Sequence, residues 1–264
     1  MAAPLSDLPS GTTRVVGIIG HPVAQVQAPH ALTAHLRGRG VDAMVVPFEV
    51  APDDLAPFLA GIARSPSLAG LVVTIPHKPA ALAAARGTPR EMRIGAANVL
   101  RRTDHGWEAD MVDGQGFGAG LRAGGFDPAG RRVLLVGAGG VGAAIAVALA
   151  DAGAAEIAIH DRDPARAAAL AERVPQARAV DAPDASGCDL AVNATPLGMA
   201  EDDPLPFDPA ALAPGAAVAE VVMKPAETRL LRAAAAHGLQ VFPGRLVMEH
   251  QLPLLAGFLF PELS

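Results

Sequence analysis

The stretch RRVLLVGAGGVGAAIAVALADAGAAEIAIHDRD, residues 131–163, decides the fold of this chain. It begins with the apolar run VLLV, continues through a glycine-rich turn and a long alanine-rich segment, and ends with a second apolar run, EIAIH. A strand, a tight turn, a helix and a second parallel strand within about 30 residues make up a βαβ unit. The sequence therefore predicts an α/β domain with a doubly wound, mostly parallel sheet around this unit.

The glycine-rich turn has the spacing of a dinucleotide-binding site. Gly137, Gly139 and Gly142 fit G-x-G-x-x-G directly after the strand, and Gly140 lies between them. The first glycine permits the tight turn, the second lets the backbone approach a pyrophosphate, and the third lets the helix pack against the strand. The helix N-terminus adds unpaired N–H groups and a positive partial charge. We therefore expect a dinucleotide to bind at this turn.

Asp161 bears on the choice of dinucleotide. It ends the second strand, 24 residues after Gly137, where a carboxylate accepts hydrogen bonds from the hydroxyls of the adenosine ribose. A 2′-phosphate at that place meets a like charge, which favours NAD over NADP. Arg162 and Arg166 act in the other direction, because a guanidinium turned towards the ribose binds a phosphate. We expect NAD as the cofactor, with NADP as the alternative and a flavin nucleotide as the less favoured one.

Strand-like and helix-like segments alternate along the rest of the chain as well. Strands are expected at 14–20, 43–50, 68–76, 188–195, 216–223 and 239–244, and helices at 28–40, 51–66 and 245–260. This order predicts two lobes: a mixed α/β substrate domain of residues 1–108, completed by the last helix at 245–264, and a Rossmann-type domain of residues 113–240. We expect the active site in the cleft between them.

Composition argues against several classes of function. Hydrophobic residues make up 51% of the 264 residues and charged residues 18%, which is typical of a globular protein. The formal net charge of -6 and the pI near 5.7 argue against binding to nucleic acid or to an anionic membrane. No run reaches the roughly 18 apolar residues of a membrane span, and the amino terminus does not resemble a signal peptide.

The cysteine and histidine content also limits the chemistry. The single cysteine, Cys188, leaves no intramolecular disulfide and suits a reducing cytoplasm. Histidines are scattered without the spacing of metal ligands, so no metal site is predicted. We therefore expect a cytoplasmic protein whose partner is a small molecule.

Six further features follow one another along the chain. They are GHPVAQVQAP (20–29), VVTIPHK (72–78), IGAANVL (94–100), DMVDGQGF (110–117), VNATPLGM (192–199) and the late Gln251. Together with the glycine-rich turn they resemble the shikimate dehydrogenase superfamily, in order and over nearly the whole chain. The resemblance implies a monomer or homodimer of aromatic amino acid biosynthesis that oxidises, with NAD(P), the secondary alcohol of a small cyclic hydroxy acid. Shikimate, quinate or a relative is then the substrate, and 3-dehydroshikimate is reduced in the reverse sense.

The resemblance also implies roles for single residues. Lys78 becomes the proton shuttle and Asp113 its paired carboxylate. A lysine in a partly desolvated cleft has its pKa lowered, and a nearby carboxylate orients it and favours the charged form. The substrate side is assigned Thr74, Asn98 and Gln251, with Val26 and Ala28 at the positions that bind the substrate carboxylate. The nicotinamide side is assigned Asn193, Thr195 and Met199.

Several polar positions of the family are apolar here. Val26 and Ala28 stand where the resemblance places two serines, and Val72 stands where it places an asparagine. Met111, Val112 and Met223 replace a further asparagine, a threonine and a tyrosine. Each substrate oxygen left unpaired costs about 1–3 kcal/mol, so we expect poor turnover of shikimate itself. The candidate substitute donors are Gln25, Gln27, His30, His77 and Lys224.

Two alternatives follow from these replacements. One is a non-catalytic or regulatory dinucleotide-binding protein that retains the fold. The other is a dehydrogenase of an aminoshikimate or deoxy analogue, because an apolar pocket suits a substrate with fewer hydroxyls. For Lys78 itself, the alternative to catalysis is a solvated lysine at the end of a strand.

Overall fold

The computed structural model describes residues 8–24, 26 and 28–263. The chain divides into two compact units, which we call unit 1 (Met1–Val112 with Leu252–Ser264) and unit 2 (Asp113–Gln251). Each unit contains its own β-sheet with helices, so the α/β class predicted from the sequence is confirmed. The last helix differs from the expectation, because only its part from Leu252 onwards belongs to unit 1.

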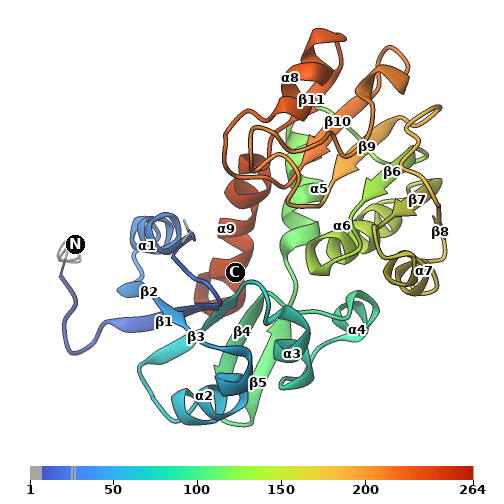
Figure 1. Cartoon of the computed structure of the whole chain (residues 1–264). Helices are drawn as coiled ribbons and strands as arrows, with labels where there is room; N and C mark the ends of the chain where they lie inside the picture. The colour runs from blue at the N-terminus through green and yellow to red at the C-terminus, as the bar shows by residue number, and fades with distance from the viewer. Residues whose placement is uncertain (1–7, 25, 27, 264) are drawn as a thin grey trace. The chain divides into compact units, whose positions relative to one another are not determined.

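Unit 1 is built on a five-stranded mixed sheet in the order β2-β1-β3-β4-β5 (Figure 1). Its strands are β1 (Arg14–Gly20), β2 (Ala43–Glu49), β3 (Leu68–Val73), β4 (Val99–Thr103) and β5 (Gly106–Asp110). β1 pairs in parallel with β2 and β3, whereas β3, β4 and β5 pair antiparallel. The last two strands form a hairpin that leads the chain to the end of unit 1.

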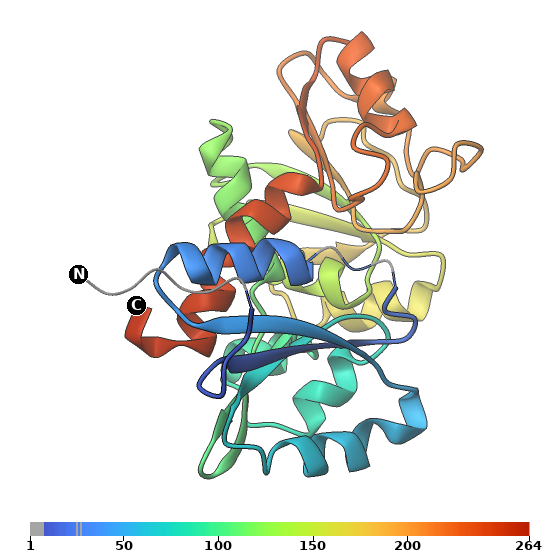
Figure 2. The ribbon, with the colours of Figure 1, turned by 90° about the vertical axis from the view of Figure 1, so that its left-hand side faces the viewer.

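Helices cover both faces of this sheet. They are α1 (Ala28–Gly38), α2 (Leu55–Ile62), α3 (Lys78–Ala83), α4 (Pro89–Ile94), α9 (Arg245–Leu259) and the short 3₁₀ helices η1 (Pro52–Asp54) and η3 (Pro261–Leu263). α1 packs on one face together with the carboxyl half of α9, and α2 and α3 pack on the other (Figure 2). Side chains of β1 alternate between these layers, Val16 and Ile18 on the first face and Ile19 on the second. Burying each such side chain stabilises the fold by about 1.5–3 kcal/mol.

The segment VVTIPHK departs from the expected strand. The apolar run ends as a strand at Val73, and a turn at Ile75 and Pro76 follows, because proline lacks the N–H that a continuing ladder needs. Lys78 is therefore the first residue of α3, not the end of a strand.

Unit 2 is built on a six-stranded parallel sheet in the order β11-β10-β9-β6-β7-β8. Its strands are β6 (Arg132–Val136), β7 (Glu156–His160), β8 (Ala177–Ala179), β9 (Leu190–Asn193), β10 (Ala217–Glu220) and β11 (Gln240–Phe242). Its helices are α5 (Asp113–Ala123), α6 (Gly140–Asp151), α7 (Pro164–Ala171), α8 (Arg229–Ala236), the first part of α9 and the 3₁₀ helix η2 (Pro209–Ala211). The order reverses between β6 and β9, which makes their carboxyl ends the place where such sheets bind ligands.

The strands of unit 2 carry continuous apolar runs because helices cover both faces of a parallel sheet. All four residues of β9 and all four of β10 are buried. α5 and α6 lie side by side in Figure 1. Among the described helices, none is long and apolar enough to cross a membrane.

Candidate active site

The glycine-rich turn lies between β6 and α6. Gly137 has a φ of 108°, which favours glycine, and its N–H donates to the carbonyl of His160 at 2.8 Å. A Cβ on Gly142 would lie 1.9 Å from the carbonyl oxygen of Gly137, so the helix packs as closely as it does only with glycine there. No side chain caps α6 at Gly139. The turn therefore leaves backbone N–H groups at a helix N-terminus, which fits the pyrophosphate of a dinucleotide.

The expected role of Asp161 as a ribose ligand stays a prediction, and the structure shows two other contacts of its carboxylate. Its Oδ2 accepts from the backbone N–H of Ala138 at 2.7 Å, and its Oδ1 accepts from that of Asp163 at 2.9 Å. Both carboxylate oxygens thus hold the backbone of the glycine-rich turn and of the loop after β7. Arg162 is exposed beside it, and Arg166 pairs with Asp163 at 3.6 Å on the surface. The loop after β7 therefore carries two exposed guanidinium groups, one of which is paired with Asp163.

The loop after β9 is fixed by Asn193, which is fully buried. The Oδ1 atom of Asn193 accepts from the N–H of Thr195 at 3.0 Å and from its hydroxyl at 2.6 Å, and its Nδ2 donates to Leu197 at 2.8 Å. A Cβ on Gly137 would lie 2.8 Å from Ala194, so this loop borders the glycine-rich turn. Met199 is 60% exposed. The structure thus brings the two expected cofactor-binding segments together at one edge of the sheet.

Asp113 and Gln251 lie together in unit 2. Asp113 begins α5 and is buried, and the Nε2 atom of Gln251 donates to its Oδ1 at 2.7 Å. A carboxylate in the first turn of a helix is stabilised by the positive end of the helix dipole. The expected contact of Gln251 with substrate stays a prediction, and the bond that the structure shows is the one to Asp113.

Lys78 is 9% exposed, which does not fit a solvated lysine at a strand end. His77, directly before it, is also buried, and its Nε2 lies 2.7 Å from the carbonyl oxygen of Val50. The carbonyl of Lys78 accepts from the N–H of Ala97 at 2.9 Å. The start of α3 is therefore fixed on both sides of the lysine.

Asn98 joins three parts of unit 1. Its carbonyl accepts from the N–H of Val73 at 2.7 Å, its N–H donates to Asp110 at 3.0 Å, and its Oδ1 accepts from the N–H of Val112 at 2.9 Å. The side-chain oxygen of Asn98, expected to face substrate, is thus bonded to the residue before Asp113.

Five of the six positions with apolar replacements lie in or pack against buried apolar parts of the structure, and the sixth, Met223, is half-buried. Val26 and Ala28 pack against the cluster on the α1 face, and Val72 is part of that cluster. Met111 and Val112 are also buried. Thr74 is half-buried after β3, while His30 and Lys224 are exposed and His77 bonds the backbone. Gln25 and Gln27 lie outside the described residues.

One network was not found from the sequence. Arg90 on α4 bonds the carboxylates of Glu91, at 2.8 Å, and of Asp110, at the end of β5. Thr88 and Glu91 form a capping box at the start of α4, and the pattern T-x-x-E in TPRE was the signal available for it. Burial raises the pKa of Asp110, and the guanidinium of Arg90 opposes this effect. The network fixes the chain just before Met111, Val112 and Asp113.

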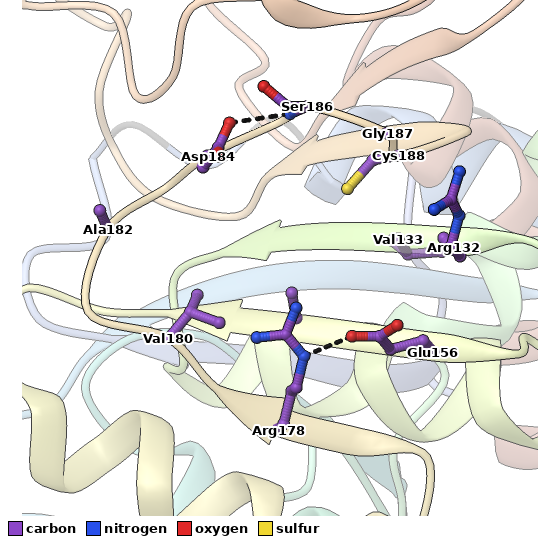
Figure 3. A pocket seen from close by; sticks show the side chains of 11 residues that line it. Arg132, Val133, Glu156, Arg178, Val180, Ala182, Asp184, Ser186, Gly187 and Cys188 are labelled. Carbon is purple, nitrogen blue, oxygen red and sulfur yellow. Dashed lines mark hydrogen bonds and ion pairs between the residues drawn. The ribbon is translucent and has the colours of Figure 1, made fainter.

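A hollow of about 250 Å³ lies elsewhere in unit 2, lined by the first residues of β6 and β7 and by the segment before β9. Figure 3 shows Arg178 paired with Glu156 there, and Asp184 accepting from the backbone of Ser186. Burial raises the pKa of the Cys188 thiol, so this cysteine is not an activated nucleophile. Among the described residues, no cluster of three or more histidine, cysteine or acidic side chains suits a metal ion.

The glycine-rich turn on a parallel sheet, with a second α/β unit that carries a buried lysine, defines a two-domain NAD(P)-dependent dehydrogenase. Residues 18–100 match the family model of the shikimate dehydrogenase substrate binding domain, and residues 123–189 match that of shikimate / quinate 5-dehydrogenase. The chain belongs to the shikimate dehydrogenase family.

Relatives and solved structures agree with this assignment. A shikimate dehydrogenase (NADP(+)) of Acidiphilium cryptum is 44% identical over 92% of this chain and 88% of its own length. The shikimate 5-dehydrogenase of Thermus thermophilus, solved with NADP(H) and shikimate, is 32% identical with a TM-score of 0.86 and 94% coverage of both chains. The 5-ketofructose reductase of a Gluconobacter strain is 29% identical with a TM-score of 0.84, over 94% of this chain and 93% of the other. These relatives support an NAD(P)-dependent enzyme but not the expected preference for NAD.

Proposed function

We propose that this protein is an NADP-dependent dehydrogenase that interconverts a cyclic hydroxy acid of the shikimate and quinate type with its keto form. The observation that carries the proposal is the buried Lys78, because an alcohol dehydrogenase without a metal needs a side chain that takes up the hydroxyl proton. The 44% identity to a shikimate dehydrogenase supports the substrate class.

In this proposal the residues of the chain move and hold the proton. The ammonium or amine of Lys78 gives a proton to, or takes it from, the oxygen at the reacting carbon. Asp113 is its partner carboxylate, and Gln251 keeps the Asp113 carboxylate in one orientation. NADP, when bound, supplies or accepts the hydride. Asn98 and Arg90 fix the backbone that carries Asp113.

The choice of NADP rests on the loop after β7. Arg162 and Arg166 are the groups that we assign to the 2′-phosphate, because a guanidinium binds phosphate through several parallel N–H donors. Two backbone N–H groups share the charge of Asp161, which lessens its repulsion of a 2′-phosphate.

A second candidate is a reductase of a neutral keto-sugar or polyol. It is favoured by Val26 and Ala28, whose apolar side chains face the core at the positions assigned to the substrate carboxylate. The 5-ketofructose reductase among the solved structures acts on a substrate of that kind by its name.

The test follows nicotinamide absorbance with the full chain and a panel of shikimate, quinate, an aminoshikimate and 5-ketofructose, each with NADP(H) and NAD(H). Turnover of a cyclic acid with a preference for NADP supports the first candidate, and turnover of the neutral ketone alone supports the second. Lys78→Ala and Lys78→Arg should both lose about 10²–10⁴-fold in kcat, because arginine does not release its proton. Arg64→Ala, on the surface of unit 1, serves as the control. Cofactor binding without turnover of any substrate would point to a non-catalytic protein.

A further inference from the structure

Glu220 is a buried acid that the proposed reaction does not use. It ends β10 with 1% of its surface exposed, and its Oε2 accepts from the hydroxyl of Thr228 at 2.9 Å. Its Oε1 is buried without a hydrogen-bond partner among the described residues. An ionised carboxylate with an unpaired oxygen costs far more free energy in such a place than a neutral acid does. The surroundings of Glu220 therefore favour its protonated form.

Within the described part of the chain, no charged side chain contributes to the pKa shift of Glu220. Glu220 borders a cavity of about 10 Å³, roughly the space of one water molecule, between α5 and the segment from β11 to α9. The other lining side chains are uncharged, among them Phe117, Leu121, Phe242, Pro243 and Leu246. Its neighbours are Asn193 on β9 and Thr228, the residue before α8, and neither side chain titrates. Burial raises the pKa of Glu220 to about 7, and the polar side chains of Thr228 and Asn193 act in the opposite direction.

Thr228 connects Glu220 to the loop after β9. Its hydroxyl hydrogen goes to Glu220, which leaves a lone pair to accept from the N–H of Leu231 at 3.3 Å and so to cap α8. Its methyl carbon Cγ2 lies 3.3 Å from the place where a Cβ on Gly198 would be. Glu220 thus holds the side chain of Thr228, which caps α8 and lies close to Gly198.

Glu220 also lies beside the other end of that loop. It is opposite Asn193 in the β9–β10 register, and the next residue, Val221, donates to the carbonyl of Asn193 at 3.1 Å. Asn193 in turn holds Thr195 and Leu197. Both ends of the loop 194–199 are therefore next to residues that neighbour Glu220: Asn193 at one end and Thr228 at the other.

We propose that Glu220, held as a neutral acid, is a positioning residue for the nicotinamide half of the dinucleotide, acting through Thr228 and the loop 194–199. The inference rests on the proposed function and on the family resemblance, which assigns the nicotinamide side to Asn193, Thr195 and Met199. Ionisation of Glu220 places an uncompensated charge beneath the loop, disturbs the Thr228 contact with Gly198, and weakens cofactor binding as the pH rises.

The experiment measures the dissociation constant of NADPH by fluorescence titration from pH 6 to 8.5, without substrate. The wild-type chain should bind about fivefold more weakly at the upper pH than at the lower. Glu220→Gln keeps the acceptor and the shape but not the ionisation, so its affinity should stay at the wild-type pH 6 level throughout, apart from changes common to all variants. Glu227→Gln, at an exposed glutamate seven residues on, should follow the wild type.

A second variant separates positioning from folding. Thr228→Ser keeps the hydroxyl that Glu220 and α8 share but removes the methyl group behind Gly198, so NADPH should bind more weakly with the wild-type pH slope retained. If the dissociation constant of NADPH changes with pH in the same way for the wild type and Glu220→Gln, the inference is overturned and the proposed function is not. Absence of NADPH binding to the wild type overturns both the inference and the proposed function. A melting temperature that changes in Glu220→Gln without any change in the pH profile shows a structural role only, and also overturns it.

Discussion

The side-chain oxygen of Asn98 accepts a hydrogen bond from the backbone N–H of Val112 at 2.9 Å, one residue before the carboxylate assigned to proton transfer. Both residues are buried, so water does not replace this bond when it is lost. A side chain that the family resemblance assigns to substrate thus also holds the backbone that carries Asp113.

Removal of this bond should destabilise the protein. Asn98→Ala leaves the buried N–H of Val112 without an acceptor, which costs about 1–3 kcal/mol in the free energy of unfolding. Urea denaturation followed by circular dichroism measures this loss. Equal midpoints for Asn98→Ala and the wild type would contradict the structural role.

Gln251→Ala should lower kcat while leaving cofactor affinity unchanged. The Asp113 carboxylate then lacks its 2.7 Å donor, and a hydrogen bond to a charged group is worth about 1.5–3 kcal/mol, or about 10–100-fold in rate. Steady-state kinetics and NADPH titration make the measurement. Gln240→Ala, at an exposed glutamine of the same unit that bonds the carbonyl of Gly124, is the control. An unchanged kcat would show that the orientation of Asp113 does not depend on Gln251.

Asp161→Ala should weaken the binding of NAD and the binding of NADP by similar factors, about tenfold each. Its oxygens hold the N–H groups of Ala138 and Asp163, so their loss loosens the glycine-rich turn that both cofactors use. Calorimetric titration with the two cofactors in parallel tests this. A loss confined to NAD would restore the role of ribose ligand for Asp161.

Arg162→Ala should weaken the binding of NADP by about 10–100-fold and leave the binding of NAD nearly unchanged, because only NADP carries the 2′-phosphate. The same titrations apply, with Arg173→Ala as the control at an exposed arginine of unit 2. If both cofactors bind Arg162→Ala as tightly as the wild type, the phosphate is held elsewhere.

Glu220 gives the protein a pH-dependent stability of defined sign. Its pKa rises from 4.5 to about 7 on folding, so the folded state binds more protons between these values. The free energy of unfolding should therefore decrease as the pH rises from about 4.5 to 7, by about 3 kcal/mol, and not decrease further from this group above pH 7. Urea unfolding at a series of pH values measures it, and Glu220→Gln should lack this decrease. The same slope in both proteins would place the responsible group elsewhere.

The sequence predicts the elements whose signals are local. The unit from Arg132 to His160 follows from a strand, glycines at fixed spacing and an apolar helix, all read within one stretch. The expected strand 68–76 continues too far because apolar periodicity does not show where pairing stops, and Lys78 consequently lies in a helix.

Contacts between distant residues are the part that a single sequence does not reveal. Asp161 ends the expected strand, but the N–H groups that engage its oxygens become visible only in the folded loop. Arg90 and Asp110 are 20 residues apart, and no spacing rule links them. From the sequence alone Glu220 is an ordinary acidic residue, and its place beside an apolar cavity is seen only in the structure.

The hydrogen bond between Asp113 and Gln251 also joins the first and last residues of unit 2. Unit 2 is thus an inserted domain with adjacent ends, the arrangement in which domain insertion and circular permutation are tolerated. Its second end lies within α9, which continues into unit 1, so the helix carries the chain from one unit to the other. The same closeness implies that a short linker from Val112 to Leu252 would be a natural way to rejoin the remaining segments of unit 1.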